Sequence, residues 1–314
     1  MSGCMGSGKK VQILLSTYNG EKYLREQLDS YIGQTCFPII RVLIRDDGST
    51  DGTVGILKEY AERYGFEILY GENIGVNASY GVLLQASDPE CAYFALSDQD
   101  DVWLPEKIEI ALHHLTAHEG CEPALFFSLS RIVDERLNTI SESHFPTRGT
   151  SFYNAMVQNV CPGHTQVWNA AMRERLLRTD FSHAHILDWW IYLLASGTGK
   201  LYFAPQCTVL HRQHGNNAVG YEMNPLKNLL IRLKRVRSKE AAAISRQLEC
   251  FLQDYGEELS DAHRTEVKLF LGAQASIIWR FSYIIHSKIF RQARMDTILV
   301  YLLYLLGKYR MKDR

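Results

Sequence analysis

The stretch that decides the fold is AYFALSDQDDVW, residues 92–103, which joins an apolar run to a dense group of carboxylates. The run AYFAL is typical of a buried β-strand, and Asp98, Asp100 and Asp101 follow it directly. Closely spaced carboxylates repel one another, so at least one pKa would rise unless a cation were bound. One of the three can cap the helix expected near Pro105. A divalent metal held by oxygen ligands accounts for the others.

Three earlier apolar runs are each followed by a polar segment in the same way. The runs 11–16, 39–44 and 66–71 predict strands, and the segments after them are STYNG, RDDGSTD and GENIG. Helical patterns lie at 21–34, 53–64 and 75–87. This alternation predicts a parallel α/β sheet, which binds ligands outside the carboxyl ends of its strands. Each segment alone is an ordinary solvated loop, but four on one edge predict a shared site.

The second half of the chain has a different pattern. Residues 123–134 are typical of strands, 157–177 of a loop or strand leading into a helix, and 200–217 of two short strands and a polar loop. From about residue 222 the sequence is helical and basic, with helices predicted over 262–290 and 295–311. Basic residues interleaved with Leu and Ile over 225–239 suit a helix on an anionic lipid surface. A helical cap and a dimer interface are the alternatives.

Composition narrows the class of protein. The 314 residues carry a net charge of −1, so no overall field selects nucleic acid as a partner. The seven cysteines lack paired spacing, which favours reduced thiols and a cytoplasmic location. We expect no signal peptide and no spanning helix, because no window reaches about 18 clean apolar residues. Gly3 to Lys9 nearly matches a P-loop, but its strand follows it and Lys10 replaces Ser or Thr, so we expect no phosphate site there.

Four ordered motifs resemble the start of family 2 glycosyltransferases, which have the GT-A fold. They are LLSTYNGEKYLREQLDSYIGQT, IRDDGSTDGT, ENIGVNASYGVLLQAS and SDQDDVWLPEKI, within residues 11–115. LDWW and LHRQHGNN further resemble the bacterial rhamnosyltransferase-like branch, so the likeness covers roughly residues 11–220. The resemblance implies an α/β GT-A fold, with a mostly parallel central sheet flanked by helices and a C-terminal helical extension. The domains expected are a leader (1–10), a catalytic domain (11–221, with a nucleotide-binding half 11–115 and an acceptor and catalytic half 116–221) and a helical region (222–314).

The resemblance also implies roles for single residues. Those implied in nucleotide binding are Thr17, Tyr18, Asn19, Asp46, Asp47, Asn73, Gly75 and Asp98. Asp47 would bind the base, and Asp46 would support the pocket or the ribose. Asp98 and Asp100 would form the DxD element and hold the metal together with His214, while Asp101 is a third carboxylate nearby.

The remaining implied roles belong to the reaction itself. Asp188 matches the position of the catalytic base, and Arg212 could face the diphosphate. Trp189 and Trp190 lie on the acceptor side, and we expect one of them to pack in the core. His185 departs from the pattern of the branch, in which a histidine more often stands directly before the aspartate.

The sequence therefore predicts a metal-dependent inverting glycosyltransferase of the hexosyltransferase type. A divalent ion, Mg²⁺ or Mn²⁺, would compensate the charge of the departing nucleotide diphosphate, and Asp188 would take the proton of the acceptor hydroxyl. The predicted donor is dTDP-rhamnose, and the acceptor is a cell-surface glycan or its lipid carrier, reached at the inner face of the cell membrane. Three alternatives remain: another donor such as a UDP-hexose or N-acetylhexosamine, a nucleotidyltransferase, and a non-catalytic sugar-binding protein.

Overall fold

The structure, a computed structural model, describes residues 8–117, 122–214 and 240–311. Its contacts divide the chain into two compact units, which are described separately. The first unit comprises residues 1–145, 161–182 and 199–217, and the second comprises 146–160, 183–198 and 218–314. Two internal segments, 146–160 and 183–198, thus group with the C-terminal helices, and the boundary predicted after residue 221 lies outside the described residues. The leader up to residue 7 and the basic segment 225–239 lie outside the described residues.

One half of the central sheet is parallel, as predicted. Its strands are β1 (Val11–Thr17), β2 (Ile40–Asp46), β3 (Glu67–Tyr70) and β4 (Tyr93–Ser97), in the spatial order β3-β2-β1-β4. All three pairs in this half are parallel, and Thr17 lies opposite Asp46 in the register. The carboxyl ends of the strands therefore meet along one edge, where the four polar segments begin.

The other half of the sheet is mixed and returns the chain to that edge. It contains β8 (Val167–Asn169), β6 (Ala124–Val133), β9 (Lys200–Arg212) and β5 (Val102–Trp103), and β7 (Thr139–Glu142) pairs with β6. β8 is antiparallel to both β4 and β6, whereas β9 runs parallel to β6. Because Val102 of β5 pairs with Leu210 of β9, the end of β9 lies beside the carboxylates that follow β4.

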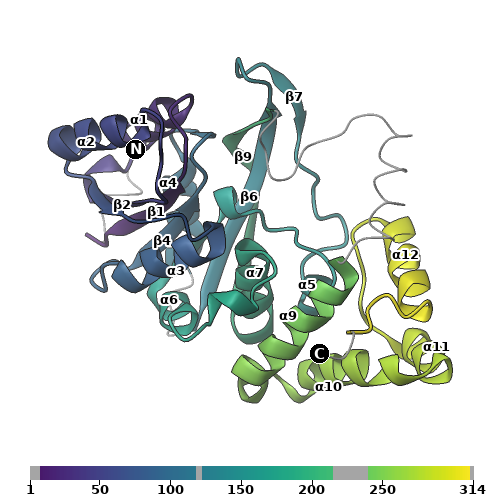
Figure 1. The fold of residues 1–314 in the computed structure, drawn as a ribbon. Helices are drawn as coiled ribbons and strands as arrows, with labels where there is room; N and C mark the ends of the chain where they lie inside the picture. Colours follow the sequence, from purple (N-terminus) through teal and green to yellow (C-terminus); the bar gives the residue numbers. More distant parts are fainter. Residues whose placement is uncertain (1–7, 118–121, 215–239, 312–314) are drawn as a thin grey trace. The chain divides into compact units, whose positions relative to one another are not determined.

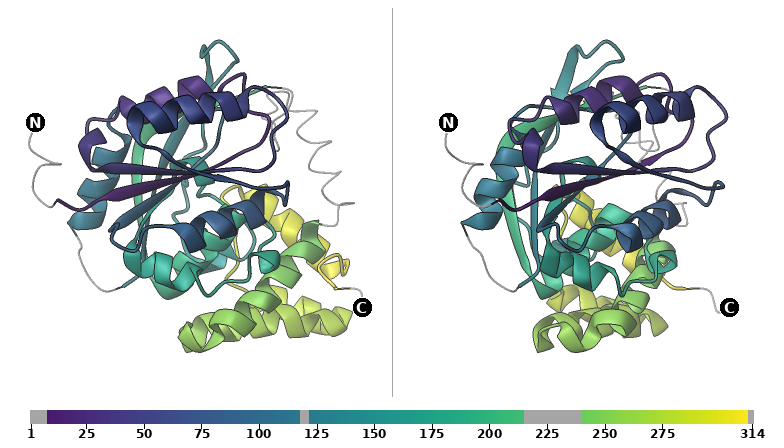
Figure 2. Two further views of the ribbon diagram at one scale, coloured as in Figure 1. Left: turned by 60° about the vertical axis from the view of Figure 1, so that its left-hand side comes forward. Right: turned by 90° about the vertical axis from the view of Figure 1, so that its left-hand side faces the viewer.

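Helices cover both faces of the sheet in the first unit (Figure 2). α1 (Leu24–Ile32), α2 (Thr53–Tyr64) and α4 (Lys107–Thr116) share one core with the strands, whereas α3 (Val76–Ala86) and α6 (Ala170–Leu176) belong to the opposite side. Alternate residues of β1 point into the first core, namely Val11, Ile13 and Leu15, and all are fully buried. Burial on both faces explains why the strands have continuous apolar runs.

The second unit is helical (Figure 1). Its helices are α5 (Phe152–Ala155), α7 (Leu187–Thr198), α9 (Glu240–Tyr255), α10 (Asp261–Gly272), α11 (Ile277–His286) and α12 (Arg294–Leu305). The helix predicted over 262–290 is interrupted, because Ser276 is extended and its side chain caps α11 by accepting from the N–H of Trp279. α12 ends before Gly307, whose φ of 70° is left-handed. Among the described helices, none has the length and apolar character needed to cross a membrane.

Short 3₁₀ turns lie between these elements: η1 (Phe37–Ile39), η2 (Gly163–Thr165), η3 (Phe181–His183), η4 (Gly256–Glu258) and η5 (Ala273–Ala275). The cysteines differ in part from the expectation of reduced thiols. Cys91, Cys161, Cys207 and Cys250 are free, whereas Cys36 is disulfide-bonded.

Candidate active site

The loops after β1 and β2 are joined by hydrogen bonds centred on Asn19. The backbone N–H of Asn19 donates to the Ser49 hydroxyl at 2.9 Å, and the Asn19 side-chain oxygen accepts from the N–H of Thr50 at 2.8 Å. The φ of Asn19 is 48°, a left-handed value that asparagine tolerates better than most residues. In the next step along the chain, the N–H of Gly20 donates to the Thr53 hydroxyl at 2.8 Å. The two polar segments therefore form one rigid wall.

The adjacent aspartates after β2 have different surroundings. Asp47 is buried, forms an ion pair with Arg45, and accepts from the N–H groups of Ile74 and Gly75 at 3.1 and 3.0 Å. Asp46 is also buried; its Oδ2 accepts from the N–H of Ser49 at 2.9 Å. Its Oδ1 has no hydrogen-bond partner among the described residues. A buried carboxylate oxygen without a donor is costly, so Asp46 retains a free acceptor, while Asp47 chiefly ties the β3 loop to β2.

The remaining nucleotide residues predicted from the sequence lie along the same edge. Asn73 and Gly75 belong to the loop after β3, and the φ of Gly75 is 82° where it precedes α3. Gly48 has a φ of 83°, and a Cβ there would stand 3.1 Å from the backbone nitrogen of Asn73. Only glycine suits both the conformation and this close approach. The loops after β2 and β3 are therefore packed against each other.

Gln99, between the two aspartates of the DxD element, joins β4 to the loop after β1. Its Oε1 accepts from the Thr17 hydroxyl at 2.6 Å and from the N–H of Tyr18 at 2.9 Å. Its Nε2 donates to the carbonyl of Tyr18 at 3.1 Å. These bonds fix the backbone of Tyr18, whose side chain is exposed. The sequence did not single out Gln99, although its position within the element was a usable signal.

Asp100 and His214 form the closest carboxylate–imidazole pair at this edge. Asp100 Oδ2 lies 2.7 Å from His214 Nε2, and the ring of Tyr23 packs against the His214 imidazole at 5.0 Å between centroids. Burial, together with the charges of Asp101 and Asp98, raises the pKa of Asp100, and His214 opposes this rise only in part. A bound cation would also relieve the repulsion among the three carboxylates. Asp100 Oδ2 and His214 Nε2 are therefore candidate metal ligands.

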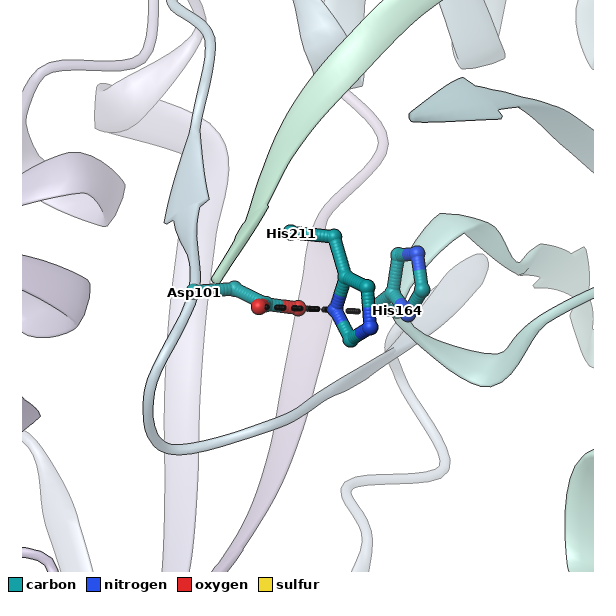
Figure 3. Close-up of side chains that lie close together, drawn as sticks. All are labelled: Asp101, His164 and His211. Carbon is teal, nitrogen blue, oxygen red and sulfur yellow. Dashed lines mark hydrogen bonds and ion pairs between the residues drawn. The ribbon is translucent and has the colours of Figure 1, made fainter. Parts of the chain in front are cut away.

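Asp101, His211 and His164 form a second group beside that pair (Figure 3). His211 Nδ1 lies 3.0 Å from Asp101 Oδ1, which also accepts from the N–H of Arg212 at 3.0 Å. The rings of His211 and His164 are stacked with centroids 4.4 Å apart, and their ligand atoms together with that of Asp101 lie within 4.8 Å of one another. Three such donors could also hold a metal ion.

His211 and Asp101 stabilise each other's charged forms within this second group. Burial disfavours the charged form of His211, but the hydrogen bond and charge of Asp101 outweigh it and raise the pKa of His211 to about 9. Burial likewise opposes the charged form of Asp101, yet His211, His164 and the N–H of Arg212 together lower the pKa of Asp101. The pair is therefore an ionic link between β9 and the residues after β4, and Asp101 does more than cap a helix.

Lys107 is an unexpected buried cation beneath this group. Its Nζ donates to the carbonyl of His164 at 2.9 Å and lies 4.4 Å from the centroid of the Trp103 ring. Burial lowers the pKa of Lys107 to about 7, although the charges of Asp101 and Asp98 oppose this change. Because it holds the backbone at His164, Lys107 positions η2 against the carboxylates.

Arg212, for which a contact with the diphosphate is predicted, is a buried side chain. The side chain is 1% exposed, and its guanidinium donates to Glu26 at 2.7 Å and to the carbonyls of Asp100 and Glu135 at 2.9 and 2.6 Å. It also lies 4.4 Å from the centroid of the Tyr23 ring. These contacts fix the backbone of the DxD element, and the role of Arg212 at the diphosphate stays a prediction.

We predict that Arg212→Met lowers the free energy of unfolding by about 2–4 kcal/mol, because two carbonyls and a carboxylate lose their donor. Urea unfolding at neutral pH measures the change. Arg136→Met, at an exposed arginine of the same unit, is the matched control and should be nearly neutral. An unchanged stability of Arg212→Met combined with weaker nucleotide binding would support the diphosphate role.

Asp188 and the two tryptophans lie in the second unit. Asp188 is in the first turn of α7. Trp189 is 3% exposed and donates from its indole nitrogen to the carbonyl of Ala155 at 2.6 Å, and Trp190 is fully buried against Phe251. Both rings are therefore in the core, whereas the sequence predicts core packing for only one of them. Their role is to anchor the start of α7.

His185, whose role the sequence left open, also has a structural partner. Its backbone N–H donates to the Gln247 side chain at 2.9 Å, and its ring lies 6.2 Å from that of Trp189. His185 thus helps to fix the segment that leads into α7.

The order of the strands and helices defines the class of protein: an α/β protein with the GT-A fold. Solved structures share this fold. TarS of S. aureus (residues 1–349, in complex with UDP-GlcNAc) has a TM-score of 0.54 at 15% identity, covering 97% of this chain and 93% of that chain. The mannosyltransferase PcManGT of Pyrobaculum calidifontis, in complex with GDP-Man and Mn²⁺, has a TM-score of 0.53 at 14% identity, covering 95% and 85%.

The chain belongs to Glycosyl transferase family 2, because the sequence model of this family matches residues 12–174. The dTDP-rhamnosyl transferase RfbG of Shigella flexneri is 30% identical over 240 residues, which are 72% of this chain and 80% of RfbG. The uncharacterized protein Rv1520 of Mycobacterium tuberculosis is 31% identical over 217 residues, 66% of this chain; the match spans 59% of the length of that relative. The predicted family, fold and enzyme class are confirmed.

Proposed function

We propose that the protein is a metal-dependent inverting glycosyltransferase that moves rhamnose from dTDP-rhamnose to a glycan or lipid-linked acceptor in cell-surface polysaccharide synthesis. The observation that carries this proposal is the pair of Asp100 and His214, 2.7 Å apart, at the end of β4. This pair stands in a wall built from the loops after the parallel strands, where such sheets bind nucleotides. The name of the relative RfbG supports the choice of donor.

The ligand set fits a divalent ion. Asp98, Asp100 and His214 would hold it, and a carboxylate combined with an imidazole suits Mn²⁺ at least as well as Mg²⁺, which prefers oxygen ligands. Once bound, the ion would offset the charge that develops on the departing diphosphate. Asp46, with its unpartnered buried oxygen, is a candidate acceptor for a donor group of the nucleotide.

The transfer itself needs one base. The acceptor hydroxyl oxygen forms a bond to the anomeric carbon while the bond from that carbon to the diphosphate oxygen breaks, and Asp188 takes the hydroxyl proton. Attack from the face opposite the leaving group inverts the anomeric centre. A single positioned carboxylate is sufficient for this role and contributes about 10²–10⁴-fold.

The proposal also covers where the enzyme acts and which partners it binds. The acceptor is a glycan or its lipid carrier at the inner face of the cell membrane, and residues 222–314 would bring the enzyme to that surface or form a homodimer. A different donor is the alternative, since the structural neighbours TarS and PcManGT were solved with UDP-GlcNAc and GDP-Man.

A panel of nucleotide sugars tests the proposed donor. We expect dTDP-rhamnose with Mn²⁺ to raise the melting temperature more than UDP-GlcNAc, UDP-glucose or GDP-mannose, and to be the donor consumed in the presence of acceptor. Thermal shift followed by a nucleotide-release assay measures both. Consumption of a UDP-sugar in preference to dTDP-rhamnose would replace the donor and leave the transferase class intact.

A further inference from the structure

Helices α11 and α12 carry an unusual concentration of exposed apolar side chains. Nine of the eighteen large hydrophobic residues exposed among the described residues lie within these two helices and the residue after α12. We call them the α11–α12 apolar face: Ile277, Ile278, Trp279, Phe281, Ile285, Met295, Ile298, Leu302 and Leu306. Single exposed apolar residues are normal on a protein surface, but a concentration of them on two neighbouring helices is typical of a contact site.

Packing within the second unit does not require this face. The inner sides of α10, α11 and α12 already share an aromatic core: Tyr283 lies 5.0 Å from Tyr304, and Phe270 lies 5.1 Å from Tyr304, between ring centroids. Arg280 also joins the two helices by donating to the carbonyl of Leu305. On α12 the residues 295, 298, 302 and 306 follow a helical period on the side opposite the buried Val300, Leu303 and Tyr304. The outward stripe is therefore additional to the core.

The charge around this face is strongly one-sided. Over residues 277–310 the chain has six Lys or Arg residues and one acidic residue, Asp296. Four of the cations are exposed: Lys288, Arg294, Lys308 and Arg310. A second copy of the chain would bring the same positive surface against itself, so repulsion disfavours a symmetric self-contact here. An apolar face bordered by cations instead complements a bilayer that contains anionic lipid.

We propose that α11 and α12 lie in the interface of an anionic phospholipid bilayer, with the α11–α12 apolar face in the headgroup region. Trp279, 63% exposed, is the residue type that favours this depth. Lys308 and Arg310, just beyond α12, face the lipid phosphates. This contact sharpens the membrane role suggested for residues 222–314 to two described helices, and it does not depend on the identity of the donor or on sugar transfer.

Co-sedimentation of the full-length chain with vesicles tests the contact without any activity measurement. Wild-type protein should pellet with phosphatidylcholine vesicles that contain phosphatidylglycerol, bind far less to pure phosphatidylcholine, and be released by high salt. Ile278→Ser combined with Trp279→Ser should lower the partition coefficient by at least about tenfold, because both side chains lose their apolar contact. Lys308→Glu combined with Arg310→Glu should remove the preference for phosphatidylglycerol.

The matched control is Val82→Ser combined with Ile140→Ser, which removes two exposed apolar side chains from the first unit. It should pellet like the wild type. Circular dichroism and melting temperature establish that each variant is folded. Failure of the folded wild type to bind the anionic vesicles would overturn the proposal, as would wild-type binding by the Ile278 and Trp279 double variant. So would a dimer in sedimentation velocity that this double variant converts to monomer without any change in vesicle binding.

Discussion

Asp188→Asn is expected to lower kcat for sugar transfer by about 10²–10⁴-fold while leaving nucleotide affinity within about threefold of the wild type. The amide has the shape of the carboxylate but cannot take a proton from the acceptor hydroxyl. Initial rates with saturating donor and acceptor measure the first effect, and calorimetry with the nucleoside diphosphate and Mn²⁺ measures the second. The split between rate and affinity is what distinguishes a base from a residue that binds the donor.

The structure around Asp188 indicates that this substitution changes the side-chain charge without disturbing α7. The residue stands in the first turn of α7, where an anion is favoured by the helix dipole, so the variant forfeits at most about 1 kcal/mol of that interaction. The start of the helix is held independently: Trp189 donates to the carbonyl of Ala155, and the N–H of Trp190 donates to the carbonyl of Ile186 at 3.1 Å. These contacts persist in the variant, so we expect the fold to remain intact.

Asp261→Asn is the matched control, because Asp261 also lies in the first turn of a helix of the second unit. It loses the same charge within the first turn of a helix and should retain full activity. Transfer by Asp188→Asn at the wild-type rate would refute the base assignment. A parallel loss of nucleotide binding and melting temperature would instead indicate a structural role for Asp188.

The nucleotide-binding half of the fold could be predicted because its signals are local. Strands β1 to β4 are apolar runs that end in polar segments, and parallel pairing then requires those ends to share an edge. The mixed half could not be predicted in the same way, because its pairings join distant segments. β8 is only three residues long, yet it separates β4 from β6. Two short strands were predicted where the structure has the single strand β9. Pro205 has no N–H to donate, and register shifts in the pairing of β9 with β6 accommodate it, so the strand continues.

In the candidate site, too, the residues in local motifs could be predicted, whereas the contacts between distant segments could not. Asp98, Asp100 and His214 were predicted from motifs, and the structure brings Asp100 and His214 into contact. The partners of Asp101 were not predicted: His211 and His164 lie 110 and 63 positions further along the chain, and nothing in local spacing relates them. The position of His211 in β9 is the one sequence signal for this contact. Side chains alternate along a strand, so His211 and Arg212 point to opposite faces of the sheet. Buried side chains such as Lys107 depend on the assembled core and leave no trace in the sequence pattern.

Asp100→Asn is expected to weaken Mn²⁺-dependent nucleotide binding by at least about 10–100-fold, a loss typical of damage to the ligand environment of a metal. The amide keeps the size of the side chain but removes the anionic ligand, which is one of three neighbouring carboxylates, with Asp98 and Asp101. Calorimetry with the nucleoside diphosphate, with and without Mn²⁺, measures the difference. His214→Gln should give a similar loss, and the double variant should lose little more, because both single changes disable the same ligand set.

Two controls make the result specific to this pair. Asp88→Asn changes an aspartate before the opposite end of β4, where the carboxylate accepts from the N–H of Glu90 and from the Cys91 thiol, and should bind as the wild type does. Asp101→Asn tests the neighbouring group: we expect it to lower the melting temperature, because His211 and the N–H of Arg212 lose a buried anion, while the response to Mn²⁺ persists. If Asp101→Asn removed that response and Asp100→Asn retained it, the metal would belong to Asp101, His164 and His211. The Asp100–His214 contact would then be an ordinary ion pair at the end of β4.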